Sequence, residues 1–133
     1  MGKIRQEHEL PESIVNWGWK YHHLGIPTRK KMPNERYLPQ FRFYVSEFCN
    51  NPFGIEWMRI EKDSPINKLI RTVPHIAFEV EDLAYDLANR NLKVIVTPNS
   101  PSEGTTVAMI EQNGAPIELI EFAKNNQKSS VTG

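Results

Sequence analysis

The sequence predicts an α+β fold in which two βαβββ-type modules form an open, cupped, mixed sheet, with the first module shortened. A recurring pattern supports this prediction. A histidine stands at the head of an apolar run at His23 and again at His75, and a later apolar run in each half contains a glutamate, Glu56 or Glu118. The second half also shows a strand-like run, a helical stretch and three more strand-like runs in order. Two copies indicate a duplicated module rather than a longer repeat array.

The second module, residues 73–123, is the complete copy. It is predicted to hold strands at 75–80, 93–97, 105–112 and 116–122, a helix at 81–91 and a loop at 98–104. Leu83 and Leu87 of the helix are spaced to share one buried face. Asn113-Gly114, between the last two strands, is the strongest hairpin signal in the chain.

The first module, residues 20–62, has a strand that ends near Ile26 and a β-hairpin over 40–60. Residues 27–39 contain three prolines and many charges. Proline lacks an amide proton and disfavours helix before it, so a loop is expected where the second module has its helix. The remaining segments are predicted as an N-terminal extension at 1–19 with a short helix within 9–17, a helix at 65–70 with Ser64 as its N-cap, and a flexible tail at 124–133.

Composition narrows the class of protein. The 133 residues suit one compact domain, and the formal net charge of zero gives no reason to expect nucleic acid or an anionic membrane as a partner. No apolar run approaches the roughly 18 residues of a membrane span. The single cysteine, Cys49, cannot form an internal disulfide, and the N-terminus is polar, so we expect a cytoplasmic protein.

Two histidines and two glutamates make a full ligand set for one divalent ion, namely zinc, nickel, cobalt, manganese or iron. If the modules fold alike, pseudo-symmetry brings His23, Glu56, His75 and Glu118 together. Such an ion acts as a Lewis acid toward a small substrate that binds through two oxygens, and it stabilises an enolate formed beside a carbonyl. A glutamate near the ion would move the proton.

Several alternatives remain open at this stage. His22 and His23 are expected on opposite faces of a strand, so only one is predicted to join the site, and His23 shares the offset of His75. Glu121 and Glu111 compete with Glu118 as the carboxylate. Apolar residues occupy both faces of these strands, so the pattern does not say which face is buried. Weaker interpretations are Cys49 as a nucleophile and the basic residues 29–31 as an anion site.

At these residues the chain resembles the vicinal oxygen chelate superfamily, the group of glyoxalase I, methylmalonyl-CoA epimerase, extradiol dioxygenases and bleomycin-resistance proteins. The resemblance spans roughly 20–123 and is closest to the epimerase and glyoxalase I branch. Its motifs are Ile55-Glu56-Trp57-Met58, Asp63-Ser64-Pro65-Ile66, His75-Ile76-Ala77-Phe78-Glu79-Val80-Glu81-Asp82-Leu83 and Pro116-Ile117-Glu118-Leu119. It implies a metal held by His23, Glu56, His75 and Glu118, with Glu118 or a nearby glutamate such as Glu47 as the acid/base.

Three functions are consistent with these features. The first is a metal-dependent lyase or isomerase, and the second is a ferrous dioxygenase that uses His23, His75 and Glu118 as a facial triad. The third is a metal-free ligand-binding module in which aromatic residues line a dimer crevice, with the candidates Trp17, Trp19, Tyr44, Phe53 and Trp57. A homodimer is expected in each case, because an open cupped sheet leaves edges to cover.

Overall fold

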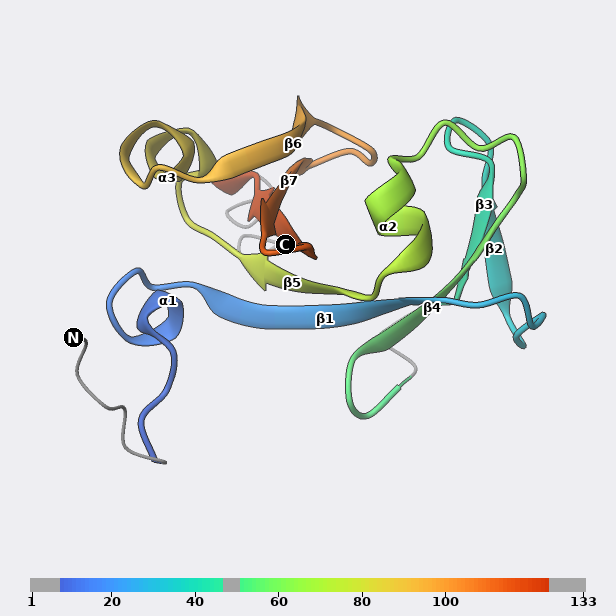
Figure 1. The fold of residues 1–133 in the computed structure, drawn as a ribbon, viewed down its shortest axis with the longest axis horizontal. Helices are drawn as coiled ribbons and strands as arrows, with labels where there is room; N and C mark the ends of the chain where they lie inside the picture. The colour runs from blue at the N-terminus through green and yellow to red at the C-terminus, as the bar shows by residue number, and fades with distance from the viewer. Residues whose placement is uncertain (1–7, 47–50, 125–133) are drawn as a thin grey trace, which may run out of the picture.

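The computed structural model describes residues 8–46 and 51–124, which form one curled sheet of eight strands with three short helices (Figure 1). In chain order the elements are α1 (Glu12–Val15), β1 (Lys20–Pro27), β2 (Glu35–Leu38), β3 (Phe43–Ser46), β4 (Ile55–Ile60), α2 (Lys68–Thr72), β5 (His75–Glu79), α3 (Leu83–Asn89), β6 (Lys93–Asn99), β7 (Thr105–Gln112) and β8 (Ala115–Phe122). The predicted fold class is therefore confirmed.

The sheet is pseudo-symmetric about its two central strands. Its strand order is β2-β3-β4-β1-β5-β8-β7-β6, so the first module reads outward as β1, β4, β3, β2 and the second as β5, β8, β7, β6. β1 pairs with β5 antiparallel, and each of these strands pairs with its own module's last strand in parallel. The two modules therefore present equivalent strands at the centre, as the repeated pattern predicts.

The first module lacks a helix between its first two strands, as expected, but the segment predicted as a loop contains a strand. β2 (Glu35–Leu38) lies inside the predicted loop at 27–39 and pairs with β3 alone. Pro33 and Pro39 lie just outside this strand rather than within it, where they remove no ladder hydrogen bond. A high density of prolines does not exclude a strand here, because proline tolerates positions beside an edge strand.

Two other boundaries differ from the sequence prediction. Helix α2 starts at Lys68, because the side chain of Asn67 accepts a hydrogen bond from the Leu69 amide and caps the helix. Ser64 does not cap it; its hydroxyl donates to the Phe41 carbonyl and accepts from the Ile66 amide. Strand β6 continues through Asn99, two residues into the predicted loop. The predicted 113–114 hairpin is confirmed, with both turn residues at positive φ.

Apolar side chains pack on both faces of the sheet. On the outer face, α3 covers a cluster that includes Trp19, Leu83 and Leu119, and the Trp19 indole donates a hydrogen bond to Asp86. On the cupped face, Met58 and Met109 pack with Ile70 of α2, which lies between the two ends of the sheet in Figure 1. Because both faces are buried, hydrophobic alternation alone left the orientation of these strands undecided.

None of the helices in the described ranges is long and apolar enough to cross a membrane.

Candidate metal centre

The four predicted ligands lie on the four central strands, one on each. Backbone register places His23, Ala77 and Glu118 in one row across β1, β5 and β8. A second row holds Glu56, Gly25 and His75 across β4, β1 and β5. Residues opposite one another in a ladder point to the same face, so all four ligands share the cupped face. Each row places a small residue between its histidine and its glutamate, which leaves room for the longer side chains to converge.

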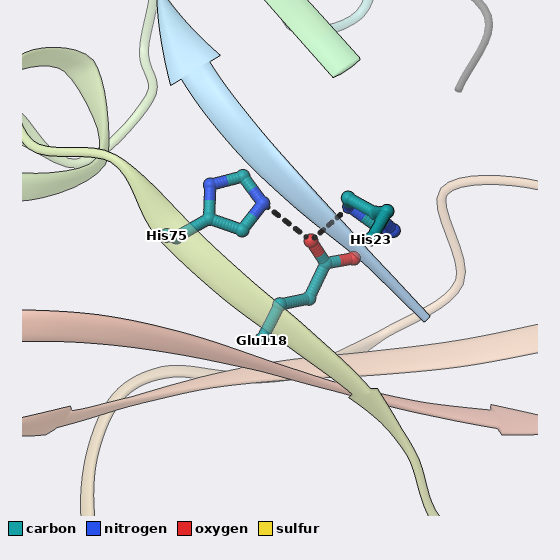
Figure 2. Close-up of side chains that lie close together, drawn as sticks. All are labelled: His23, His75 and Glu118. Carbon is teal, nitrogen blue, oxygen red and sulfur yellow. Dashed lines mark ion pairs between the residues drawn. The ribbon is translucent and has the colours of Figure 1, made fainter. Parts of the chain in front are cut away.

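Three of the four side chains meet closely (Figure 2). His75 Nε2 lies 2.9 Å from Glu118 Oε1, and His23 Nε2 lies 3.4 Å from the same oxygen. One nitrogen from each histidine and one oxygen of Glu118 all lie within 4.8 Å of one another. Glu56 Oε1 lies 3.7 Å from His23 Nε2, outside this group of three. The structure thus brings all four predicted ligands to one place, with Glu56 at its margin.

His75 lies directly against the backbone of the neighbouring strand at Gly25. A Cβ built on Gly25 would come within 2.1 Å of His75 Cε1 and 2.6 Å of His75 Nε2. No side chain larger than hydrogen fits there without displacing the imidazole, which is 3 % exposed. Sequence analysis missed this residue. The sequence pattern that could have identified it is a small residue two positions after each histidine, Gly25 after His23 and Ala77 after His75.

His22 also belongs to the site, which corrects the expectation that it faces away. The β1–β5 register shifts between Tyr21 and His23, so His22 is the extra residue of a β-bulge. The bulge breaks the strict alternation of side chains, and His22 and His23 line the same cavity. Their Nδ1 atoms lie 2.8 Å apart, so the N–H of one ring donates a hydrogen bond to the unprotonated nitrogen of the other. His22 also packs against Phe122 of β8.

The electrostatics favour a charged carboxylate between the histidines. Burial raises the pKa of Glu118, but the close contacts with the imidazoles of His23 and His75 outweigh it and lower that pKa to about 2. Burial likewise lowers the pKa of His23, and the contact with Glu118 and the charge of Glu56 reverse the effect and raise it. The pKa of His22 is lowered, chiefly by burial and then by His23. Without a metal, the contact with Glu118 therefore favours the protonated form of His23.

The donors fit a divalent transition metal. Neither ring nitrogen of the buried His75 has a hydrogen bond of normal geometry in the described part of the chain, although Nε2 lies 2.9 Å from Glu118. A buried polar atom without a hydrogen bond lowers the stability of the folded protein by about 1–3 kcal/mol. The protein alone therefore does not satisfy the nitrogens of His75, and a bound metal ion would satisfy one of them. Two imidazole nitrogens and one carboxylate oxygen suit zinc, iron, cobalt, nickel or manganese.

The competing residues are engaged elsewhere or lie outside the described ranges. Glu121 accepts a hydrogen bond from the Leu83 amide at the start of α3, and Glu111 forms an ion pair with Lys93. Residues 29–31 do not line the cavity. The five aromatic residues considered for ligand binding, Trp17, Trp19, Tyr44, Phe53 and Trp57, do not line it either. Glu47, the second candidate acid/base, and Cys49 lie outside the residues that the structure describes.

The candidate ligands line a cavity of about 530 Å³ that opens on the cupped face. Its walls come from both modules and from the segment that leads into α2. A cavity of this volume falls within the range of roughly 300–1,000 Å³ typical of small-molecule sites.

Comparison with solved structures finds the same fold in other proteins. A crystal structure of methylmalonyl-CoA epimerase from Mycobacterium tuberculosis matches with a TM-score of 0.60 and 19% sequence identity, covering 91% of this chain and 97% of that one. A hypothetical protein, BH1468 from Bacillus halodurans C-125, matches with a TM-score of 0.58 and 19% identity, covering 78% and 94%. No protein-family model and no curated protein sequence matches the chain. The likeness is one of fold.

Proposed function

We propose that this protein is a metal-dependent lyase or isomerase that acts on a small molecule carrying two neighbouring oxygens. The observation that supports this most directly is the convergence of His23, His75 and Glu118, from both modules, in the lining of a ligand-sized cavity. The fold shared with the epimerase structure is in keeping with it. Each chain would bind one ion, which would be zinc, nickel, cobalt, manganese or iron.

The chain's own residues would prepare the site in two ways. When bound, a divalent ion supplies a positive charge that lowers the energy of an enolate formed beside a carbonyl. His22 holds the ring of His23 through the 2.8 Å Nδ1–Nδ1 contact. With His22 as the acceptor, the proton of His23 stays on Nδ1, and the lone pair of Nε2 can bind the ion. Gly25 provides the space in which His75 lies.

We assign the proton transfer to Glu56 in preference to Glu118. Glu118 contacts both histidines, and a carboxylate with a pKa of about 2 is a weak base. Glu56 lines the cavity at the margin of the three ligands, where it faces a bound substrate. Its oxygen lies 3.7 Å from His23, so a proton taken from carbon would be accepted beside the site that holds the enolate.

The test measures metal first and proton exchange second. The purified protein should contain about one divalent ion per chain by elemental analysis. In deuterium oxide, the loaded protein should exchange the hydrogen next to the carbonyl of 2-hydroxy ketones, followed by proton NMR. Glu56→Gln should keep the ion and lose the exchange, whereas Glu118→Gln should lose both. Protein that holds the ion and exchanges no carbon-bound hydrogen in a broad panel of such compounds would refute the assignment.

A second function is favoured by one specific observation. The three groups that converge, His23, His75 and Glu118, are two histidines and one carboxylate, the set used by ferrous oxygenases. This reading gives Glu56 no place among the ligands, in agreement with its marginal position. Oxygen consumption by the iron-loaded protein with a catechol distinguishes the two functions, because the lyase or isomerase requires no oxygen.

The sheet ends at β2 and β6, and we propose that a homodimer covers one of these edges. Light scattering coupled to size exclusion measures the mass directly, and a monomer at all concentrations would refute this part.

A further inference from the structure

The cavity beside the candidate metal centre has an apolar floor. Val45, Met58, Met109 and Ile120 line it, and all four are at most 6 % exposed. They come from β3, β4, β7 and β8, and Ile70 of α2 packs with Met58 and Met109. Both halves of the sheet therefore supply apolar side chains to the cavity that the candidate ligands line, and Met109 lies opposite Glu118 in the β7–β8 ladder.

The polar groups around this floor are largely occupied by the chain itself. Gln40 donates a hydrogen bond to the Pro101 carbonyl and joins loops from the two modules. Asn67 caps α2, and Asn99 donates to the carbonyls of Thr97 and Val107. These amides stabilise the wall. Arg36 also lines the cavity, so the lining includes a cation besides the candidate ligands.

Size and polarity together indicate the class of substrate. A substrate of three or four carbons bound at the ligands would leave most of about 530 Å³, and its apolar floor, in contact with water. We propose that the substrate has an oxygenated head at the metal centre and a larger apolar body, an acyl chain or an aromatic group, that fills this cavity. This inference rests on the proposed function and specifies its substrate class.

A series of chelating probes tests the inference. Zinc-loaded protein is titrated by calorimetry with hydroxamates of one head group and increasing tail length, from acetohydroxamate to octanohydroxamate. Each buried methylene adds about fourfold in affinity. We expect octanohydroxamate to bind at least about a hundredfold more tightly than acetohydroxamate.

Two substitutions on one strand supply the matched control. Val96 of β6 lines the cavity, whereas Val94 does not line it and is 38 % exposed. Val96→Phe should remove most of the gain from the long tail and leave acetohydroxamate binding within about twofold of wild type. Val94→Phe should leave both affinities unchanged, since its ring would lie outside the cavity.

The outcomes separate the inference from the function on which it rests. Failure to retain zinc, or zinc that binds neither probe, overturns the proposed function and the inference with it. Retained zinc and bound acetohydroxamate with no gain from longer tails overturn the substrate class alone. A gain from tail length that Val96→Phe and Val94→Phe reduce equally also overturns it, because the tail would then lie elsewhere.

Discussion

Replacing Gly25 by alanine should weaken metal binding by about 100-fold or more, although Gly25 offers no ligand atom. The added Cβ would lie 2.1 Å from His75 Cε1, whereas non-bonded carbon atoms sit roughly 3.5–4.0 Å apart. The imidazole must therefore move by more than about 1 Å. Metal–ligand distances tolerate roughly ±0.2 Å, so the displaced ring would no longer reach an ion held by His23 and Glu118.

The expected magnitude follows from this displacement. Loss of outer partners that merely orient a ligand costs about 10–100-fold in metal affinity, and displacement of the ligand itself should cost at least the upper end of that range. Overpacking should also lower the free energy of unfolding by about 1–3 kcal/mol. Zinc affinity by competition with a chromophoric chelator measures the first effect, and thermal unfolding of the metal-free protein measures the second.

Gly114→Ala is the control for the Gly25 experiment. Gly114 has a φ of +84°, and nothing lies within 4 Å of a Cβ placed there, so alanine strains the turn without touching the site. It should cost about 1–2 kcal/mol of stability and leave zinc affinity unchanged. A folded Gly25→Ala protein that binds zinc as tightly as wild type would show that His75 is not a ligand in the position described.

The other predictions concern the ligands and their protons. His75→Ala should lose most of the bound metal by elemental analysis, and unchanged content would exclude this residue as a ligand. His22→Phe removes the contact to His23 Nδ1 and should weaken zinc binding by about 10–100-fold, whereas His22→Asn, which retains an acceptor, should restore part of it. Because the pKa of His23 is raised above 6.5, its contribution to the stability of the metal-free protein is complete below that pH and is lost as pH rises through the folded-state value. Zinc binding must displace this proton, so calorimetry in buffers of different ionisation enthalpy should detect up to about one proton released per ion, falling to none at high pH. Glu118→Gln should remove that stability change.

Much of this site could be predicted from the sequence because it lies on regular strands. The repeated histidine and glutamate positions predicted that four side chains would meet, and pseudo-symmetric pairing of β1 with β5 and of each with its last strand brings them to one face. This inference needed only that the two modules have the same order of strands.

What the sequence did not predict depends on local departures from regularity. His22 was expected to face away because strands alternate, and a bulge between Tyr21 and His23 reverses that expectation. Gly25 was overlooked because a close approach between a ring and a backbone is a contact across strands, with no periodic pattern. The strand at Glu35–Leu38 was missed because prolines beside an edge strand resemble prolines in a loop.

Anomalous diffraction from crystals of the metal-loaded protein tests the metal centre most directly. Data collected on either side of the absorption edge of the bound element should give one peak per chain, about 2.0–2.2 Å from a nitrogen of His23, a nitrogen of His75 and an oxygen of Glu118. A fully loaded protein with its peak elsewhere, or with none among these three side chains, would contradict the metal centre and the function proposed from it.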